Sequence, residues 1–278
     1  MTATAVAEPP ARFSDLLASE WLKLWSLRST VWSYVLATLV VVGFNAGAAY
    51  DRYRHWTDNN TADRASFVAD GIALMYAFTT NAGTIMMLAA GAIGAVAITG
   101  EYSTGLIRTT FAAVPARRGV MAAKVCVLAT VMTVYGAVTA AVSFWLSQAI
   151  LAGHDAGVSI ADPGSLRVVV ASALLAPVCG LVGMALGAVL RHGGTSVVSA
   201  VAVLLVVPLV LTDDRHWAAV LDHAQVSGAW MRLVDVRYDA GGPGVPFPWT
   251  MGGAWTVFAL WAVGAAVVTV LATHRRDQ

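Results

Sequence analysis

The chain has little charge and almost no lysine. Asp, Glu, Lys and Arg make up 12% of the 278 residues, whereas the apolar set makes up 58%. A soluble domain carries about a quarter charged residues, so this chain cannot cover a core of its size with polar surface, and we expect the membrane to be its solvent. The net charge of +1 also argues against nucleic acid as a partner, because binding to phosphates needs a concentrated basic surface.

The two cysteines and two lysines exclude further classes of site. Cys126 and Cys179 lie in different apolar runs, and no Cys-x-x-Cys occurs, so neither a disulfide framework nor a metal cluster is predicted. A phosphate-binding loop needs Gly-Lys followed by Ser or Thr. Lys23 follows Leu22 and Lys124 follows Ala123, so the chain has no such loop. We therefore predict that the chain is not an enzyme and itself binds no cofactor.

Long apolar runs are what the sequence has in abundance. Six runs are bounded by charge, Gly or Pro, and a helix needs about 20 residues to cross the hydrocarbon layer. We predict an all-α integral membrane protein that forms a single domain over residues 1–278. Its six transmembrane helices are expected at residues 31–50, 72–99, 121–151, 168–190, 196–211 and 251–273.

No run carries Asp, Glu, Lys or Arg at its middle. A charge kept at that depth usually marks an ion or proton path. Its absence argues against an ion-coupled transporter and against an intramembrane aspartyl or metal protease. The nearest charges are Lys124, one turn into the third run, and Glu101, just past the second.

The charged residues between the runs indicate the orientation. With the N-terminus inside, the inner side holds ten basic residues (Lys and Arg) and five acidic residues (Asp and Glu). The outer side holds seven basic and eleven acidic residues. The excess of basic residues places both termini in the cytoplasm, and we expect a multi-pass protein of a bacterial-type plasma membrane. Ala46-Gly47-Ala48 resembles a signal-peptide cleavage site, but the first run is longer than the usual 7–15 residues, which favours a retained span.

Residues 13–28 and 212–250 are predicted to flank the spans with amphipathic helices. In the first segment Phe13, Leu16, Leu17, Trp21 and Leu24 recur at helical spacing, which predicts an elbow helix along the inner membrane surface. A cytosolic extension of the first span is the alternative.

The outer segment contains acids and histidines that invite a metal-site interpretation, at Asp213, Asp214, His216, Asp222 and His223. Their spacing matches no zinc signature. Apolar residues also recur there at helical intervals, at Trp217, Val220, Leu221, Ala224, Met231 and Val234. We therefore favour one amphipathic outer helix over residues 217–236 before the last span.

Residues 100–120 form the only sizeable polar segment on the predicted cytoplasmic side. The run from Gly100 to Gly105 is punctuated by glycine and can form only a short helix, with Glu101 at its start. With the elbow, six spans and outer segment, the order Glu101, Gly105, Pro115, Arg117 and Lys124 resembles the permease subunit of an ATP-binding-cassette transporter of the type-2 exporter class.

The resemblance implies that residues 100–120 form a coupling helix, which sits in a groove of a separate ATP-binding subunit. ATP and Mg would be bound by that partner, and two permease chains, as a homodimer or a related heterodimer, would work with two ATPase chains. The residues expected to couple the partner are Glu101, Tyr102, Gly105, Arg108, Pro115 and Arg117. Glu101 could pair with Arg108 or with a basic group of the partner.

The resemblance also implies a substrate route for export between spans one, two and five of two protomers. Residues at a suitable depth are Phe44, Asn45, Asn81 and Met86.

Three alternatives remain. Residues 100–120 could be an interfacial turn in which Glu101 and Arg117 are merely solvated. The protein could be a non-transporting membrane binding, immunity or scaffold protein. It could also be a membrane-embedded enzyme with an outer Asp/His site.

Overall fold

The computed structural model describes residues 11–26, 28–210, 216–238 and 247–272. All regular secondary structure within these residues is helical. Six helical segments are long and apolar enough to cross a membrane, which confirms the predicted helical architecture and the six runs. These segments are Arg28–Arg54, Ala73–Thr104, Arg117–His154, Ser165–Leu190, Gly193–Val210 and Met251–Ala272.

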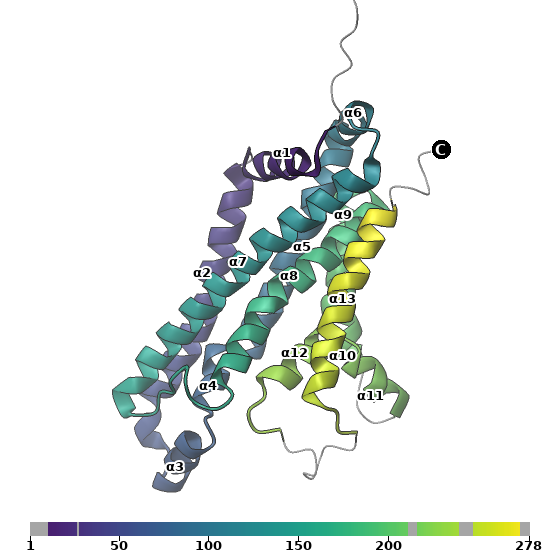
Figure 1. Cartoon of the computed structure of the whole chain (residues 1–278). Helices are drawn as coiled ribbons and strands as arrows, with labels where there is room; N and C mark the ends of the chain where they lie inside the picture. Colours follow the sequence, from purple (N-terminus) through teal and green to yellow (C-terminus); the bar gives the residue numbers. More distant parts are fainter. Residues whose placement is uncertain (1–10, 27, 211–215, 239–246, 273–278) are drawn as a thin grey trace, which may run out of the picture.

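The six segments form one bundle with short helices at both ends (Figure 1). The long helices are α2 (Arg28–Arg54), α5 (Thr80–Thr104), α7 (Arg117–Leu151), α8 (Ser165–Leu190) and α13 (Met251–Ala272). The fifth span consists of α9 (Gly193–Val201), the π-helical turn η3 (Ala202–Val206) and α10 (Val207–Val210). At one end, here called the α6 end, lie α1 (Phe13–Ser26) and α6 (Leu106–Ala113). At the opposite, α3 end lie α3 (Thr61–Ala69), α4 (Ala73–Ala77), α11 (His216–His223), α12 (Val226–Val234) and the short turns η1 (Trp56–Asp58) and η2 (Ala152–His154).

Helix α8 lies at the centre of the bundle, and glycine lets it approach its neighbours closely. In its most apolar stretch 78% of the residues are buried, against 22% for the first and last spans. A Cβ atom at Gly94 of α5 would overlap the carbonyl oxygen of Gly180 of α8, and one at Gly183 would overlap the carbonyl oxygen of Gly91. Small residues allow such backbone contact between membrane helices, where dispersion and hydrogen bonding drive association.

The second span is interrupted, and Asn45 stabilises the interruption. Helix α4 ends at Ala77 and α5 begins at Thr80, with the Thr79 hydroxyl accepting a hydrogen bond from the Ala82 N–H. The break frees the Thr79 N–H, which donates to Asn45 Oδ1 at 3.0 Å; the Thr79 hydroxyl donates to the same oxygen at 2.9 Å. Asn45 Nδ2 donates to the Ser143 hydroxyl of α7 at 3.1 Å. One buried amide thus joins three helical segments.

Replacing Asn45 by Leu is expected to lower the free energy of unfolding by about 1–3 kcal/mol, because the partly buried Thr79 N–H and the buried Ser143 hydroxyl lose their partner. The measurement is unfolding of the purified chain in a fixed detergent. Asn81→Leu is the matched control, since Asn81 is exposed at the start of α5, and its effect should stay within about 0.5 kcal/mol. Equal effects of the two variants would contradict the assigned role.

The outer segment differs from the prediction of one continuous helix. The chain breaks at Ala224 and Gln225 into α11 and α12, and it folds back so tightly that a Cβ at Gly228 would overlap the carbonyl oxygen of Asp222. The apolar residues that recur at helical intervals are not the buried ones, since Trp217, Val220, Leu221 and Met231 are all exposed. The side chains that are buried include Trp230 and Leu233 instead. Asp213 and Asp214 lie outside the described residues.

Trp230 fastens α12 to the bundle. Its ring lies against Gly83 of α5, where a Cβ would collide with it, and its Nε1 donates to the Ser172 hydroxyl of α8 at 3.1 Å. Trp230 follows the buried Val226 by four residues and precedes the buried Leu233 by three, so the three side chains share one face of α12.

Candidate functional site

Four charged side chains from three helices meet at the α6 end. Lys124 of α7 contacts Glu101 Oε1 of α5 at 2.6 Å and also Glu20 Oε2 of α1. Lys23 of α1 contacts Glu20 Oε1 at 2.7 Å and lies 3.8 Å from Glu101 Oε1. Positive and negative groups therefore alternate in a ring, which we call the charge cluster: Glu20, Lys23, Glu101 and Lys124.

The charge cluster is largely removed from solvent. Glu20 is 3% exposed and Lys124 is 6% exposed, whereas the Lys23 side chain keeps 25% of its surface accessible. A buried charge is costly unless it is paired and hydrogen-bonded. Two carboxylates and two ammonium groups cancel in net charge, so each member is tolerated only because the others are present.

The packing of α1 against α7 places Glu20 in the cluster. Leu16 of α1 is buried with Val120 and Ala123 of α7, while Leu17, Phe111 and Val114 pack around them. Glu20 follows Leu16 by four residues and so lies on the same face of α1. Sequence reasoning missed Glu20, although its spacing of four residues from both Leu16 and Leu24 carried the signal.

The sequence predicted that Glu101 starts a short helix, and the structure shows that it does not. Helix α5 continues to Thr104, and Gly105 ends it in the left-handed conformation at φ 73°. A glycine in this conformation is a common helix terminator. Glu101 therefore lies in the last turn of α5, where the helix dipole disfavours a carboxylate, and Lys124 supplies the compensation. Glu101 is neither solvated nor paired with Arg108, which is exposed.

The other predicted coupling residues surround α6. Gly105 separates it from α5, and Pro115 is exposed in the turn that leads to α7. The guanidinium of Arg117 lies 5.4 Å from the centre of the Phe111 ring, and that of Arg191 lies 5.2 Å from the Tyr102 ring. Tyr102 and Arg117 are partly buried, so only Arg108, Pro115 and the outward face of α6 are freely accessible.

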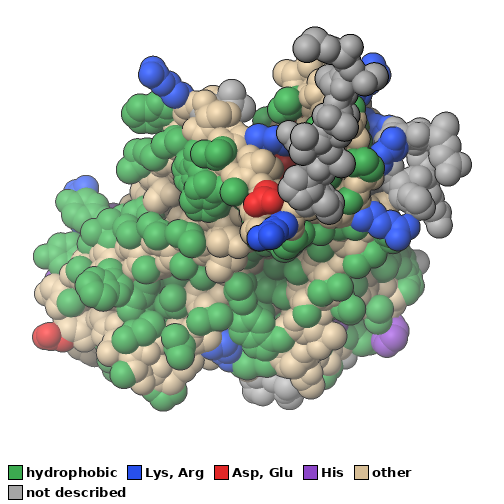
Figure 2. All heavy atoms as spheres, turned by 45° about the horizontal axis from the view of Figure 1, so that its top comes forward, with side chains coloured by type: hydrophobic (Ala, Val, Ile, Leu, Met, Phe, Trp, Pro, Cys, Tyr) green, Lys and Arg blue, Asp and Glu red, His purple; other side chains and the backbone are tan. Residues whose placement is uncertain are grey.

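Helix α6 has an inward and an outward face. Ile107 is buried and Phe111 packs on the α1–α7 contact. Leu106, Arg108, Thr109 and Ala112 are exposed. Figure 2, which brings the α6 end forward, shows mainly Lys and Arg among the charged side chains of this end, above flanks that are largely hydrophobic.

The structure does not bring the four predicted substrate-path residues together. Asn45 and Met86 are buried and line an internal cavity of about 20 Å³. Phe44 and Asn81 are exposed and line an open groove along α2. Their positions along the predicted spans put all four at a similar depth in the membrane, but position alone does not show which face of each helix points inward.

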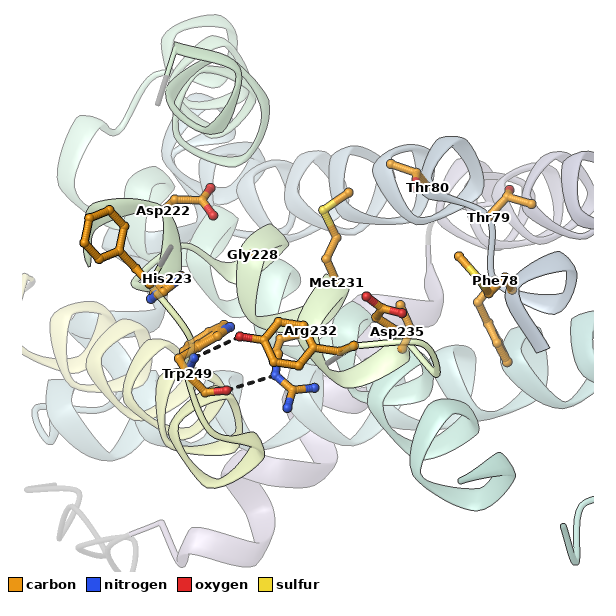
Figure 3. A pocket seen from close by; sticks show the side chains of 14 residues that line it. Phe78, Thr79, Thr80, Asp222, His223, Gly228, Met231, Arg232, Asp235 and Trp249 are labelled. Atoms are coloured by element: carbon orange, nitrogen blue, oxygen red, sulfur yellow. Dashed lines mark hydrogen bonds between the residues drawn. The ribbon is translucent and has the colours of Figure 1, made fainter. Parts of the chain in front are cut away.

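A separate pocket of about 380 Å³ opens at the α3 end (Figure 3). Asp222 and His223 lie on one side of it, Arg232 and Asp235 in the middle, and Thr79 and Thr80 on the other. Arg232 Nε donates to the Trp249 carbonyl at 3.1 Å, and its guanidinium lies over the Tyr238 ring. The His223 ring is stacked on Trp249 and the His216 ring meets the edge of Phe247. Among the residues that the structure describes, no three His, Cys, Asp or Glu are grouped to hold a metal.

A scan of the chain against models of known protein families finds no match, and a search of curated proteins finds none either.

Proposed function

We propose that this chain is the permease subunit of an ATP-binding-cassette exporter and that it works in the plasma membrane with a second permease chain. A separate subunit binds Mg and ATP and hydrolyses the nucleotide. The observation that carries this proposal is α6 together with the charge cluster beneath it. A short helix with a free outward face lies at the end of the bundle and connects directly to two of its long helices, α5 and α7.

The contacts of α6 suit a helix that receives a push or pull from outside. It continues into α5 through Gly105 and into α7 through the turn at Pro115. Lys23 Nζ donates to the Thr110 hydroxyl of α6 at 3.4 Å, so α1 contacts it as well. The charge cluster ties α1, α5 and α7 to one another directly below. A displacement of α6 would therefore move three helices as a unit.

The length of these helices would carry such a displacement across the bundle. Helix α5 has 25 residues and α7 has 35. At about 1.5 Å per residue, each is long enough to cross a hydrocarbon layer of about 30 Å. Within the proposal, α5 and α7 act as levers, with the cytoplasmic ATPase at the α6 end and both termini on the same side.

The outward face of α6 offers an apolar surface with one cation to the partner. Leu106 is 41% exposed, and Arg108 is exposed as well, with a side chain that makes no hydrogen bond or ion pair to any described residue. Arg108→Glu is expected to reduce co-purification with the proposed ATP-binding-cassette subunit at least about ten-fold, because a charge reversal at a protein interface costs on the order of 1.4 kcal/mol or more.

The matched control is Arg28→Glu, which reverses an exposed charge at the same end but outside α6. It should co-purify like the parent chain, and both variants should unfold at the parent temperature. Undiminished co-purification of Arg108→Glu would refute the placement of the partner on α6. Transport by the isolated chain without any ATPase would refute the proposal as a whole.

A further inference from the structure

A cleft of about 490 Å³ lies beside the charge cluster, between the corner of α1 and α2 and the last turns of α5. Its wall is apolar along α5 and α7, where Ile93, Val96 and Val127 line it. Its end is polar, because all four members of the charge cluster line it together with several hydroxyl groups. The cleft therefore changes from charged to apolar along its length.

The cleft has its polar end and its apolar wall in the same order as the headgroups and acyl chains of one membrane leaflet. Helix α1 lies across the end of the bundle (Figure 1), and it exposes Trp21 and Trp25. Exposed tryptophans of membrane proteins favour the headgroup layer. The wall from Gly100 back to Ala92 spans eight residue-to-residue steps of α5, which corresponds to about 12 Å towards the hydrocarbon. An occupant must have a polar head at α1 and an apolar tail along α5.

The polar end of the cleft is rich in hydrogen-bond acceptors. Ser26, Ser33, Ser103 and Thr104 line it, and each hydroxyl already donates its proton to a backbone carbonyl of its own helix at 2.8–2.9 Å. Their lone pairs remain to accept a hydrogen bond. Within the described part of the chain, Glu101 Oε2 makes no hydrogen bond, so it too can accept one.

Of the two lysines that line the cleft, only Lys23 is accessible. Lys124 is enclosed between Glu20 and Glu101, whereas a quarter of the Lys23 side chain is exposed. A suitable head therefore carries one anionic group for Lys23 and hydrogen-bond donors for the surrounding oxygens. A phosphate next to a primary ammonium meets both requirements. A trimethylammonium head has no N–H to donate, and a glycerol head brings donors without a cation.

We propose that this cleft binds a phospholipid with a phosphoethanolamine head. The phosphate lies at Lys23, the ammonium points to Glu101 and the hydroxyl oxygens, and an acyl chain lies along α5. This site needs no ATPase, so it does not depend on the proposed transport function.

The test uses the full chain, purified in detergent and mixed with equal amounts of phosphatidylethanolamine, phosphatidylglycerol and phosphatidylcholine of the same acyl chains. Native mass spectrometry then reports which lipid the chain retains. Phosphatidylethanolamine should be retained about ten-fold over phosphatidylcholine, as expected for a charge-assisted hydrogen bond. Equal retention of the three lipids would overturn the proposal.

Two variants connect this preference to the cleft. Gly100 lines the cleft and a Cβ there meets nothing within 4 Å, so the ring of Gly100→Phe should occupy the cleft and abolish the preference. Gly264→Phe is its matched control, because Gly264 is also a helical glycine with open space but lies on α13 outside the cleft. The double variant Ser103→Ala/Thr104→Val removes two acceptors from exposed positions and should weaken the phosphatidylethanolamine preference alone. An undiminished preference in both cleft variants would also overturn the proposal.

A second measurement separates a resident lipid from cargo. In proteoliposomes that contain the chain, the ATPase and ATP, transfer of a fluorescent phosphatidylethanolamine between leaflets would identify the lipid as cargo. Retention in the native spectrum without such transfer would identify a resident lipid. Both results support the site, and failure of ATPase binding would leave the lipid measurement unaffected.

Discussion

Lys124→Met is expected to lower the free energy of unfolding by about 3–5 kcal/mol, the range found when one partner of a buried ion pair is removed. The methionine fills the space of the aliphatic lysine stem, so packing changes little. What is lost is the cation that separates Glu20 from Glu101. Two carboxylates with little exposure would then share Lys23 as their one compensating charge within the described cluster.

Unfolding in a fixed detergent, monitored by the far-ultraviolet helical signal, measures this effect. Arg118→Met is the matched control, because Arg118 is an exposed cation on the same helix, and it should change stability by at most about 0.5 kcal/mol. Adding Glu101→Gln to Lys124→Met removes the excess carboxylate and should recover at least half of the loss. A loss below about 1 kcal/mol for the single variant, typical of an exposed ion pair, would show that the cluster is solvated.

Gly94→Ala is expected to destabilise the bundle by about 3 kcal/mol, at the upper end of the range for overpacking. The added methyl group would overlap the Gly180 carbonyl, which belongs to the backbone of the most buried helix. A side chain could change its rotamer, but α8 can only move as a whole. Because α8 also contacts α7 and α13, its movement would loosen those contacts too.

Gly43→Ala is the matched control for this prediction, because it should raise the stability of the bundle where Gly94→Ala lowers it. A Cβ at Gly43 meets nothing within 4 Å, so the alanine adds no clash within the chain. Alanine is about 0.8–1.0 kcal/mol more favourable than glycine inside a helix, and a small gain in stability is expected. Thermal unfolding of the two variants side by side measures the difference. A stable Gly94→Ala variant would mean that α5 and α8 are not in backbone contact there.

Hydropathy predicted the helical segments well, with ends that shifted by a few residues. The third was expected at residues 121–151 and extends from Arg117 to His154. The first was expected at residues 31–50 and extends from Arg28 to Arg54. In lipid every backbone N–H and C=O must be bonded within the segment, so a long apolar run leaves few alternatives to a helix. This constraint is local, and a single sequence expresses it directly.

Breaks and faces were predicted less well, because they depend on neighbouring helices. The interruption at Thr79 is stabilised by Asn45, which lies 34 residues earlier. The outer segment bends at Ala224 and Gln225, and Trp230 then turns inward against α5 and α8. An apolar membrane helix has a weak amphipathic signal, since both lipid and protein interior accept the same residues. Periodicity therefore could not separate the inward from the outward face.

By itself, the sequence determined the helical fold, the six apolar segments and the polar connection at residues 100–120, because each follows from the solvation of consecutive residues. Only the tertiary structure decided that Lys124 pairs with both Glu101 and Glu20. Glu20 precedes Lys124 by 104 positions, and the two meet because α1 folds back across the end of α7. Ion pairing of this kind depends on distances of a few ångströms between helices, and no local pattern records those distances.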